Sequence, residues 1–393
     1  MMKRAFATGV LAGTVFLTAL PGLSAAQETS STTDAYRITP LAENLDHPWN
    51  LTFMPDGSML IVQLPGVIRV LKDGALSEPL PGVPDVYFES QGGLFEVLPD
   101  PDYSDNGYVY LSYAHGTPDE NGTRVARARF DGKAFSDLEV IFDAAPTKDT
   151  PVHYGGVMTF LPDSTLLIAV GDGFDYREQA QRLDNDLGKI VRINRDGSIP
   201  EDNPFVDEEG ARPEIWSYGH RNQQGLIYDE TSGRVYEHEH GPQGGDEINI
   251  IRPDRDGGAN YGWPTVSHGR EYATGLRISK HDSLPGYVDP AWVWIPSIAP
   301  SGMAFYPDAA DGNDSGVMFP EFKGNLLVGS LKFRRLYLVK LDGNTGLPRS
   351  EHIILDGQIG RIRDVAVAPH GPNAGAILLL SDEVKGGLYM MKQ

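Results

Sequence analysis

The stretch from Ile215 to Pro264 concentrates side chains that can bind ligands or transfer protons. Histidines, an arginine, an asparagine and carboxylates are interspersed there with glycines, at a density that an ordinary apolar core would not tolerate. We therefore expect a polar or charged ligand to lie against this stretch. The polar side chains concerned are His220, Arg221, Asn222, His238, His240, Asp246 and Glu247.

Two kinds of metal site are conceivable within this stretch. His238 and His240 share one face of a strand and could begin a zinc site, but no third ligand follows at a telling spacing. The Gly241-Pro242 step offers two successive carbonyls at a bend, the oxygen environment that suits calcium. Glu247 and the backbone at Asn260-Tyr261 could form a second oxygen site, or could belong to a satisfied surface loop.

Four basic residues are expected near one site, although the chain as a whole is strongly acidic. They are Arg221, Lys332, Arg361 and Arg363. The last two alternate on a strand, so they point the same way, and both cannot be buried without an anion. This pattern predicts a ligand with carboxylates or phosphates. The alternative is pairing within the chain, for example of Arg363 with Asp364 or with an acid from elsewhere.

His153 is the candidate general base. It precedes Gly155-Gly156, where a ligand could approach the backbone closely, and an imidazole can accept a proton near neutral pH. A single histidine is more often structural, so its position in the fold has to decide.

Several classes of chemistry lack their motifs. The chain has no cysteine, which rules out thiolate metal sites, cysteine nucleophiles and a disulfide scaffold. The GDG at Gly171 does not open a helix, no G-x-G-x-x-G follows a strand, and no G-x-S-x-G is found. An oxidoreductase of this sequence would not hold its redox carrier in a Rossmann fold.

The N-terminus predicts export. Lys3 and Arg4 precede the apolar run 5–20 and a small-residue stretch, which indicates a signal peptide over residues 1–26 and a flexible linker over 27–35. A membrane anchor would need about 20 uninterrupted apolar residues. Loss of the two bases takes the net charge from −21 to −23, which disfavours nucleic acid and anionic lipid as partners. We expect a periplasmic or secreted protein.

A recurring phrase organises the rest of the chain: a hydrophobic strand, a turn usually built on Pro-Asp, and a second hydrophobic strand. Its spacing averages about 63 residues, more than compact propeller blades need. We predict an all-β fold, a six-bladed β-propeller with long inter-strand loops, as a single domain over 36–393. A double β-sandwich would not predict so regular a phrase. The six turns fall at Pro55, Pro99, Pro162, Asp229, Pro307 and Pro369.

Propeller geometry then places the candidate residues. The strand before each turn should be the inner one, so positions about eight residues upstream mark where each blade meets the central channel on one face. Most of these positions are polar, and we expect them to converge on one pocket. They are His47, Gln91, the neighbourhood of His153, Arg221, Ala299 and Arg361.

Motifs in this order resemble the soluble quinoprotein glucose/sorbosone dehydrogenases, specifically the aldose sugar dehydrogenase branch. The resemblance covers nearly all of the chain after residue 26. It implies a six-bladed propeller that holds pyrroloquinoline quinone (PQQ) over the channel mouth, with Ca²⁺ between cofactor and protein. The motifs include QGGLFEV at Gln91, HYGG at His153, WSYGHRNQQGL at Trp216, EHGPQGGDEINII at Glu239, NYGWP at Asn260 and GRIRDV at Gly360.

The resemblance also implies roles for individual residues. His153 would take the proton from the anomeric hydroxyl of an aldose while hydride passes to the quinone, and Arg221 would polarise the quinone oxygen. Some members carry an acid before this histidine where the present chain has Val152, which leaves open what orients His153. The implied cofactor contacts are Gln91, Asn222, Tyr272, Lys332, Arg361 and Arg363, and the implied metal ligands are Gly241, Pro242, Glu247 and Tyr261.

The expected function is oxidation of aldoses to aldonolactones, with electrons passing to an external quinone or cytochrome. We expect a monomer or homodimer without stable membrane insertion. Two alternatives stay open at this point. A metal-dependent sugar lactonase would need several carboxylates converging on the channel, and a non-catalytic propeller would bind a protein or glycan.

Overall fold

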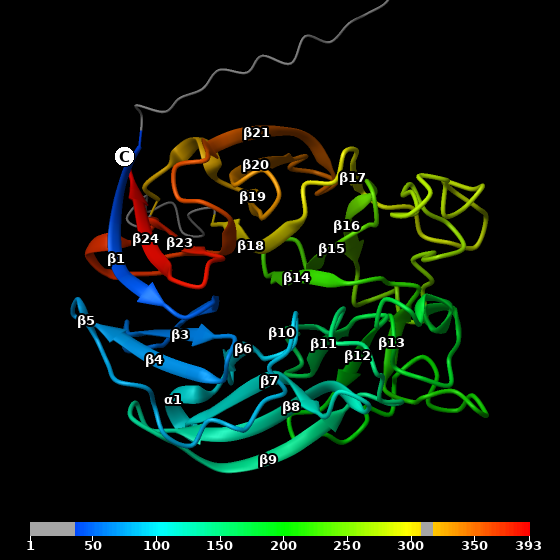
Figure 1. Cartoon of the computed structure of the whole chain (residues 1–393), viewed down its shortest axis with the longest axis horizontal. Coiled ribbons are helices and arrows are strands. Elements are labelled where there is room, and N and C mark those ends of the chain that lie inside the picture. Colours follow the sequence, from blue (N-terminus) through cyan, green and yellow to red (C-terminus); the bar gives the residue numbers. More distant parts are fainter. Residues whose placement is uncertain (1–35, 308–316) are drawn as a thin grey trace, which may run out of the picture. The chain divides into compact units, whose positions relative to one another are not determined.

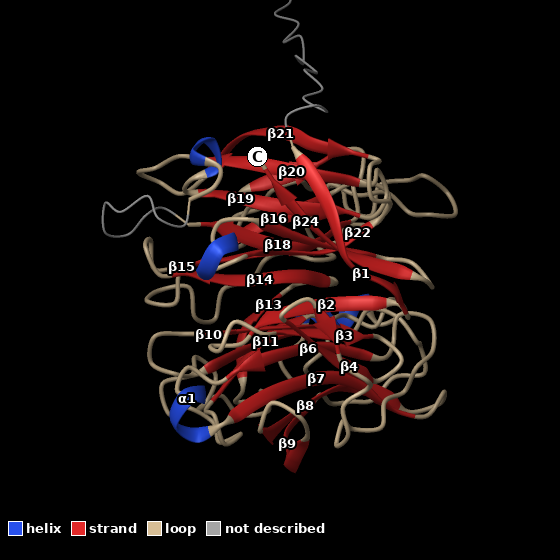
Figure 2. Cartoon of the chain, turned by 90° about the vertical axis from the view of Figure 1, so that its left-hand side faces the viewer, coloured by secondary structure: helices blue, strands red, loops and turns tan. Residues whose placement is uncertain are grey.

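The computed structural model describes residues 36–307 and 317–393. The signal peptide and linker predicted for residues 1–35 lie outside this part of the chain. Among the described residues no helix is long and apolar enough to cross a membrane. Strands account for nearly all of the regular structure (Figure 2). The helices are α1 (Tyr103–Asn106) and the 3-10 turns η1 (Arg177–Gln181), η2 (Pro320–Phe322) and η3 (Gly371–Asn373).

The strands form six antiparallel four-stranded sheets. The first sheet has β2 (Pro48–Phe53), β3 (Met59–Gln63), β4 (Val67–Lys72) and β5 (Ala75–Leu76). The second has β6 (Leu94–Pro99), β7 (Tyr108–Gly116), β8 (Asn121–Phe130) and β9 (Phe135–Asp143). The third has β10 (Gly155–Phe160), β11 (Leu166–Val170), β12 (Lys189–Ile193) and β13 (Ile215–Tyr218).

The remaining three sheets follow in chain order. The fourth has β14 (Gln223–Asp229), β15 (Arg234–Glu239), β16 (Asp246–Ile251) and β17 (Trp292–Trp294). The fifth has β18 (Pro300–Tyr306), β19 (Asn325–Ser330), β20 (Arg335–Leu341) and β21 (Pro348–Asp356). The sixth has β22 (Ile362–Val367), β23 (Ile377–Ser381), β24 (Gly386–Lys392) and, from the other end of the chain, β1 (Arg37–Leu45).

The first strand of each phrase is the inner strand of a blade, as predicted. The inner strands β2, β6, β10, β14, β18 and β22 contact one another in cyclic order, and β22 returns to β2. This closed ring confirms the predicted six-bladed β-propeller. The ring is closed by β1, which pairs with β24 from Arg37 opposite Lys392 to Leu45 opposite Gly386 (Figure 1).

The hydrophobic runs are continuous because both faces of each blade are covered. In β11 and β19, for example, every residue is buried. The core is divided into large apolar clusters that each join two adjacent sheets; one of them packs Leu60 and Ile68 of the first sheet against Val97 and Leu111 of the second. Burial between two neighbours explains why alternation of polar and apolar residues is weak along these strands.

The recurring Pro-Asp turn has a local cause. An aspartate side chain can accept a hydrogen bond from the amide two residues later and so hold the turn. Asp56 accepts from the Ser58 amide at 3.0 Å, Asp100 from the Asp102 amide at 2.9 Å, and Asp163 from the Thr165 amide at 2.9 Å. The same side-chain chemistry thus repeats at the turns after β2, β6 and β10, and it fixes where each inner strand ends.

Candidate active site

The loops that lead into the inner strands meet at one end of the channel. A cavity of about 210 Å³ lies there, and three of the positions projected from the sequence, His47, Gln91 and Arg361, line it directly. Asn222 and Arg363 line it as well. His153 is joined to the same wall, because its backbone amide donates to Gln91 Oε1 at 2.9 Å. Three of the six projected positions therefore meet at one cavity, whereas His153, Arg221 and Ala299 do not line it.

Three other predicted site residues lie in a second cavity. Pro242, Tyr272 and Lys332 line a space of about 630 Å³, and Ala299 lines neither cavity. Leu331 lines the first cavity and Lys332 the second, so the two spaces adjoin at the loop after β19. Arg361 and Arg363 thus line the first cavity and Lys332 the second, while Arg221 lines neither, so the four bases do not share one cavity.

His153 is held by a buried aspartate that the sequence analysis did not identify. Its Nδ1 lies 2.7 Å from Oδ1 of Asp172, whose side chain is fully buried. Asp172 also accepts from the Phe174 amide at 2.9 Å and from the Trp263 indole at 2.8 Å, while its own amide donates to the Arg221 carbonyl at 2.7 Å. Asp172 is therefore the residue that orients His153 in a chain that has Val152 before the histidine.

This contact decides the tautomer of the imidazole. An ionised carboxylate only accepts, so Nδ1 of His153 carries the proton and Nε2 keeps its lone pair. No described residue forms a hydrogen bond with Nε2. The ring is thus arranged to accept a proton from a ligand at that nitrogen.

The local charges keep this base neutral. Burial lowers the pKa of His153, and the guanidinium of Arg221 lowers it further, against the opposite effect of Asp172. Burial opposes ionisation of Asp172, yet His153, Arg221 and the Phe174 amide together hold the pKa of that carboxyl below its usual value. The resulting state is a neutral imidazole above an ionised aspartate.

Arg221 lies between the histidine and the turn at Gly241. Its Nη1 donates to the carbonyls of His240 at 2.7 Å and Gly241 at 3.0 Å, and its guanidinium stacks over Trp263 at 5.2 Å. Its backbone amide donates to Glu239 at 2.9 Å. Nε of Arg221 is buried and has no hydrogen-bond partner among the described residues. One donor of a fixed cation is therefore free for a ligand.

Arg361 and Arg363 differ in their partners. Arg361 forms an ion pair with Asp382 at 2.7 Å and is substantially exposed, which fits the alternative of pairing within the chain. Arg363 is buried, lies over the Trp49 ring at 4.1 Å and donates to Gln224 at 2.9 Å. It has no ion pair with Asp364, whose carboxylate accepts from the Leu51 amide instead.

An unpaired buried cation is expensive, and burial lowers the pKa of Arg363 accordingly. An anionic ligand in the cavity would relieve that cost. Of the two arginines on this strand, Arg363 is thus the stronger candidate for an anion contact.

The oxygen donors proposed for metals lie on the fourth blade. The Gly241 carbonyl already accepts from Arg221, and the Gly241 amide donates to Asp246 at 2.9 Å. Glu247 lies opposite Glu239 on the neighbouring strand, and burial together with Glu239 and Asp246 raises the pKa of its carboxyl. The phenol of Tyr261 donates to the Ile250 carbonyl at 3.3 Å and its amide donates to the Tyr218 carbonyl at 2.8 Å, so its carbonyl oxygen is the atom that could serve a metal.

The His-x-His pair is not a zinc site in the described structure. Nε2 of His240 donates to the Pro300 carbonyl at 2.6 Å, while both ring nitrogens of His238 are buried without partners. Burial lowers the pKa of His238 to about 3. Both rings are therefore neutral, and neither has a described acidic ligand beside it on that face of the strand.

Aromatic rings border the histidine on its solvent side. The Phe174 ring packs edge-on against His153 at 5.1 Å and stacks with Tyr272 at 6.2 Å. Phe174 and Tyr272 are both exposed. Exposed rings beside a polar cavity form a surface on which the apolar face of a sugar ring can pack.

Titration of His153 tests the electrostatic part of this description. NMR of the protein without ligands should give a His153 midpoint below pH 6.5, because burial and Arg221 both disfavour the imidazolium. In Arg221→Gln the midpoint should rise, since the nearby positive charge is gone. Lys133→Gln, which removes one charge from an exposed hairpin, serves as the control and should leave the midpoint in place. A midpoint above pH 6.5, or one unmoved in Arg221→Gln, would contradict the description.

Comparison with known proteins agrees with the fold. Residues 45–390 match the family profile described as Glucose / Sorbosone dehydrogenase. The aldose sugar dehydrogenase of Escherichia coli is 39% identical over 359 residues, which cover 89% of this chain and 91% of that protein.

Solved structures give the same result. The apo-form of the soluble aldose sugar dehydrogenase from Escherichia coli superposes with a TM-score of 0.83 at 37% identity, covering 91% of this chain and 99% of that one. The PQQ-bound aldose sugar dehydrogenase from Streptomyces coelicolor gives 0.70 at 26% identity, covering 91% and 98%. The chain described above belongs to the glucose/sorbosone dehydrogenase family.

Proposed function

We propose that this chain oxidises aldose sugars at the anomeric carbon to aldonolactones, with PQQ and Ca²⁺ as cofactors. The observation that carries the proposal is the geometry of His153, with Nδ1 fixed by Asp172 at 2.7 Å and Nε2 left free. A general base needs a neutral ring and a fixed tautomer, and both are present. The printed name of the PQQ-bound relative supports the choice of cofactor.

The reaction removes a hydride from C1 and a proton from the hydroxyl on the same carbon. Nε2 of His153 accepts that proton, and the C1–O bond becomes the carbonyl of the lactone. Bound PQQ supplies a two-electron acceptor for the hydride. Two electrons then leave for an external acceptor, a quinone or a cytochrome.

Arg221 assists by electrostatics. Its free Nε and its fixed charge can stabilise an oxygen on which negative charge develops. The same charge keeps His153 neutral in the resting state. One side chain would thus prepare the base and stabilise the product of its action.

The cations fit a cofactor that carries several carboxylates. Arg363 has no acidic partner and would gain one. Lys332 in the adjoining cavity and Arg361 beside it would add weaker contacts, Arg361 because Asp382 already neutralises it. Gln91, Asn222 and Tyr272 would complete the walls.

Calcium would be held by the carbonyls of Gly241 and Pro242. Oxygen donors alone suit this ion, and Arg221 would have to release the Gly241 carbonyl when the ion binds. Calcium would act as a Lewis acid and orient the cofactor. Glu247 and the backbone of Tyr261 are the candidates for a second calcium site.

The alternatives find less support in the cavity. A sugar lactonase needs several free carboxylates, whereas Asp382 is the one acid among the described residues that line the 210 Å³ cavity, and it is paired with Arg361. A binding module has no use for the Asp172–His153 pair. We further propose that the protein is exported and acts as a monomer or homodimer.

Reconstitution tests the proposed reaction. The protein with PQQ and Ca²⁺ should reduce a dye with a panel of aldoses, and His153→Gln should lower kcat about 10²- to 10⁴-fold. The kcat/KM of the wild-type protein should fall as the pH drops through the pKa of His153, hence below pH 6.5. His352→Gln, a change on an exposed outer strand, is the control and should keep full activity. No activity with any aldose, or full activity in His153→Gln, would refute the proposal.

Cofactor affinity tests the two arginines separately. Arg363→Gln should weaken PQQ binding by about 10- to 100-fold, the worth of one charge-assisted hydrogen bond. Arg361→Gln should weaken it less, because Asp382 already satisfies that guanidinium. Fluorescence titration of the two variants with PQQ provides the comparison. Equal losses, or a larger loss in Arg361→Gln, would contradict the assignment.

A further inference from the structure

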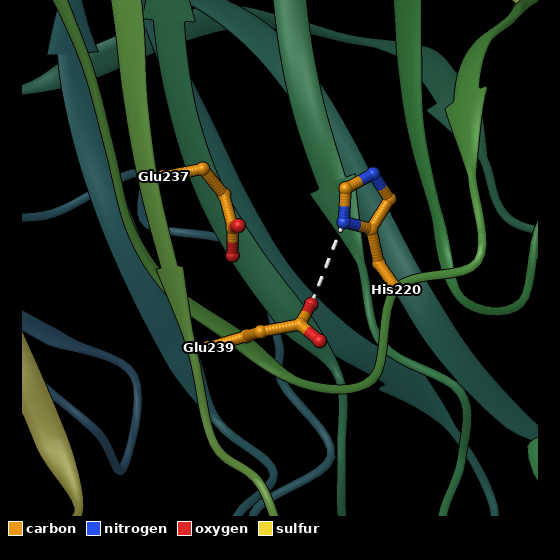
Figure 3. A group of neighbouring side chains, drawn as sticks. All are labelled: His220, Glu237 and Glu239. Atoms are coloured by element: carbon orange, nitrogen blue, oxygen red, sulfur yellow. Dashed lines mark ion pairs between the residues drawn. The ribbon is translucent and has the colours of Figure 1, made fainter. Parts of the chain in front are cut away.

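A second group of chemically capable side chains lies on the fourth blade, outside both cavities. His220 comes from the loop before β14, and Glu237 and Glu239 come from one face of β15. One ligand atom from each residue lies within 4.8 Å of the others, and Figure 3 shows the Glu239 carboxylate facing the imidazole with the Glu237 carboxylate beside them. The closest approach is 3.5 Å, between Nδ1 of His220 and Oε2 of Glu239.

These groups are buried without enough partners. His220 and Glu237 are 0% exposed, yet Nδ1 of His220 and Oε1 of Glu237 have no hydrogen-bond partner among the described residues. Oδ1 of Asn249, which donates its Nδ2 to Glu237 at 2.9 Å, is likewise unpartnered. A buried polar atom without a partner destabilises the fold. A cation between His220 and Glu237 would satisfy Nδ1 of the one and Oε1 of the other together.

The surroundings already hold the donors in place. Nε2 of His220 lies 2.9 Å from the Ser217 hydroxyl, so the ring can present the lone pair of Nδ1 to the group. The Tyr261 ring stacks on the imidazole at 4.7 Å, and Glu239 accepts from the Arg221 amide at 2.9 Å. Metal-binding histidines commonly have such a partner on the second ring nitrogen.

Apart from His220 within the group, no described basic side chain offsets the charge of Glu237. The groups that act on Glu237 are burial, the carboxylates of Glu239 and Glu247, and the Asn249 amide, and the net result raises the pKa of Glu237. Without a cation, Glu237 would have to stay protonated. That protonated state is the competing account of the group.

We propose that His220, Glu237 and Glu239 bind a divalent transition-metal ion, and that the ion is zinc. Zinc accepts both imidazole nitrogen and carboxylate oxygen and needs only three or four ligands, whereas calcium takes 6–8 oxygen ligands. Glu247, the cross-strand neighbour of Glu239, is outside the set. This site is distinct from the carbonyl site at Gly241 and does not depend on the proposed oxidation.

The position of the site gives the ion a structural role. His220 precedes Arg221, and Glu239 precedes the His240-Gly241 turn that Arg221 contacts. A metal bridging His220 and Glu239 would tie together the two segments that place the guanidinium. The ion would therefore act as a positioning element and not as a reactant.

Metal content of the protein without PQQ tests the proposal. After incubation with ZnSO₄ and desalting, mass spectrometry of the wild-type chain should find one zinc per chain. Glu237→Gln and His220→Gln should bind zinc more than about 100-fold more weakly. This exceeds the loss of about 10- to 100-fold that is typical when a residue that only hydrogen-bonds a metal ligand is replaced. Glu230→Gln, in the exposed turn between β14 and β15 of the same blade, is the matched control and should retain the zinc. Circular dichroism verifies that each variant is folded.

A second measurement on the wild-type protein does not depend on the variants folding. Anomalous diffraction at the zinc edge should place a peak between the three side chains. Absence of zinc from the wild-type protein, zinc retained in both Glu237→Gln and His220→Gln, equal loss in Glu230→Gln, or calcium in place of zinc at this position would each overturn the proposal.

Discussion

The buried carboxylate of Asp172 is the contact on which the candidate site depends. It joins the loop that carries His153 to the Trp263 indole at 2.8 Å, and its own amide donates to the Arg221 carbonyl. Three segments from two blades are thus fixed by one residue. Because a buried charge is tolerated only when it is well paired, this arrangement cannot loosen without cost.

The ring determines which residues can reach that carboxylate. Every inner strand begins at the same end of the channel, so the loops before β6, β10, β14 and β22 face one another. Cations gather there in a chain that is strongly acidic overall. The two arginines of β22 and the loop before it differ in their partners. Arg361 is neutralised by Asp382, whereas Arg363 contacts only Gln224 and Trp49. An anion would find its strongest contact at the deeper of the two.

Much of the fold could be predicted from sequence because its signals are local. A Pro-Asp turn such as Pro162-Asp163 is held by the aspartate side chain of the turn itself, and it marks the end of an inner strand wherever it occurs. The closure by β1 has no such signal, because its partner β24 lies at the far end of the chain. The shortest outer strand, β5, has two residues, too few to show any periodicity.

The site was predictable only in part, for the same reason. Loop positions could be counted from the turns, which brought His153 and Gln91 together. The sequence does not point to Asp172, because the GDG at Gly171 matches no ligand-binding motif. The contact of Asp172 with His153 depends on how two strand ends lie in space. The pairing of Arg361 with Asp382 likewise joins the ends of neighbouring strands.

The most direct measurement of the central claim is single-turnover reduction of the reconstituted Asp172→Asn variant. The side chain keeps its shape but loses the charge that fixes the His153 tautomer. We predict that the rate of sugar oxidation falls about 10²- to 10⁴-fold, while PQQ affinity stays within about threefold of the wild-type value. An unchanged rate would contradict the account, as would a loss confined to cofactor binding.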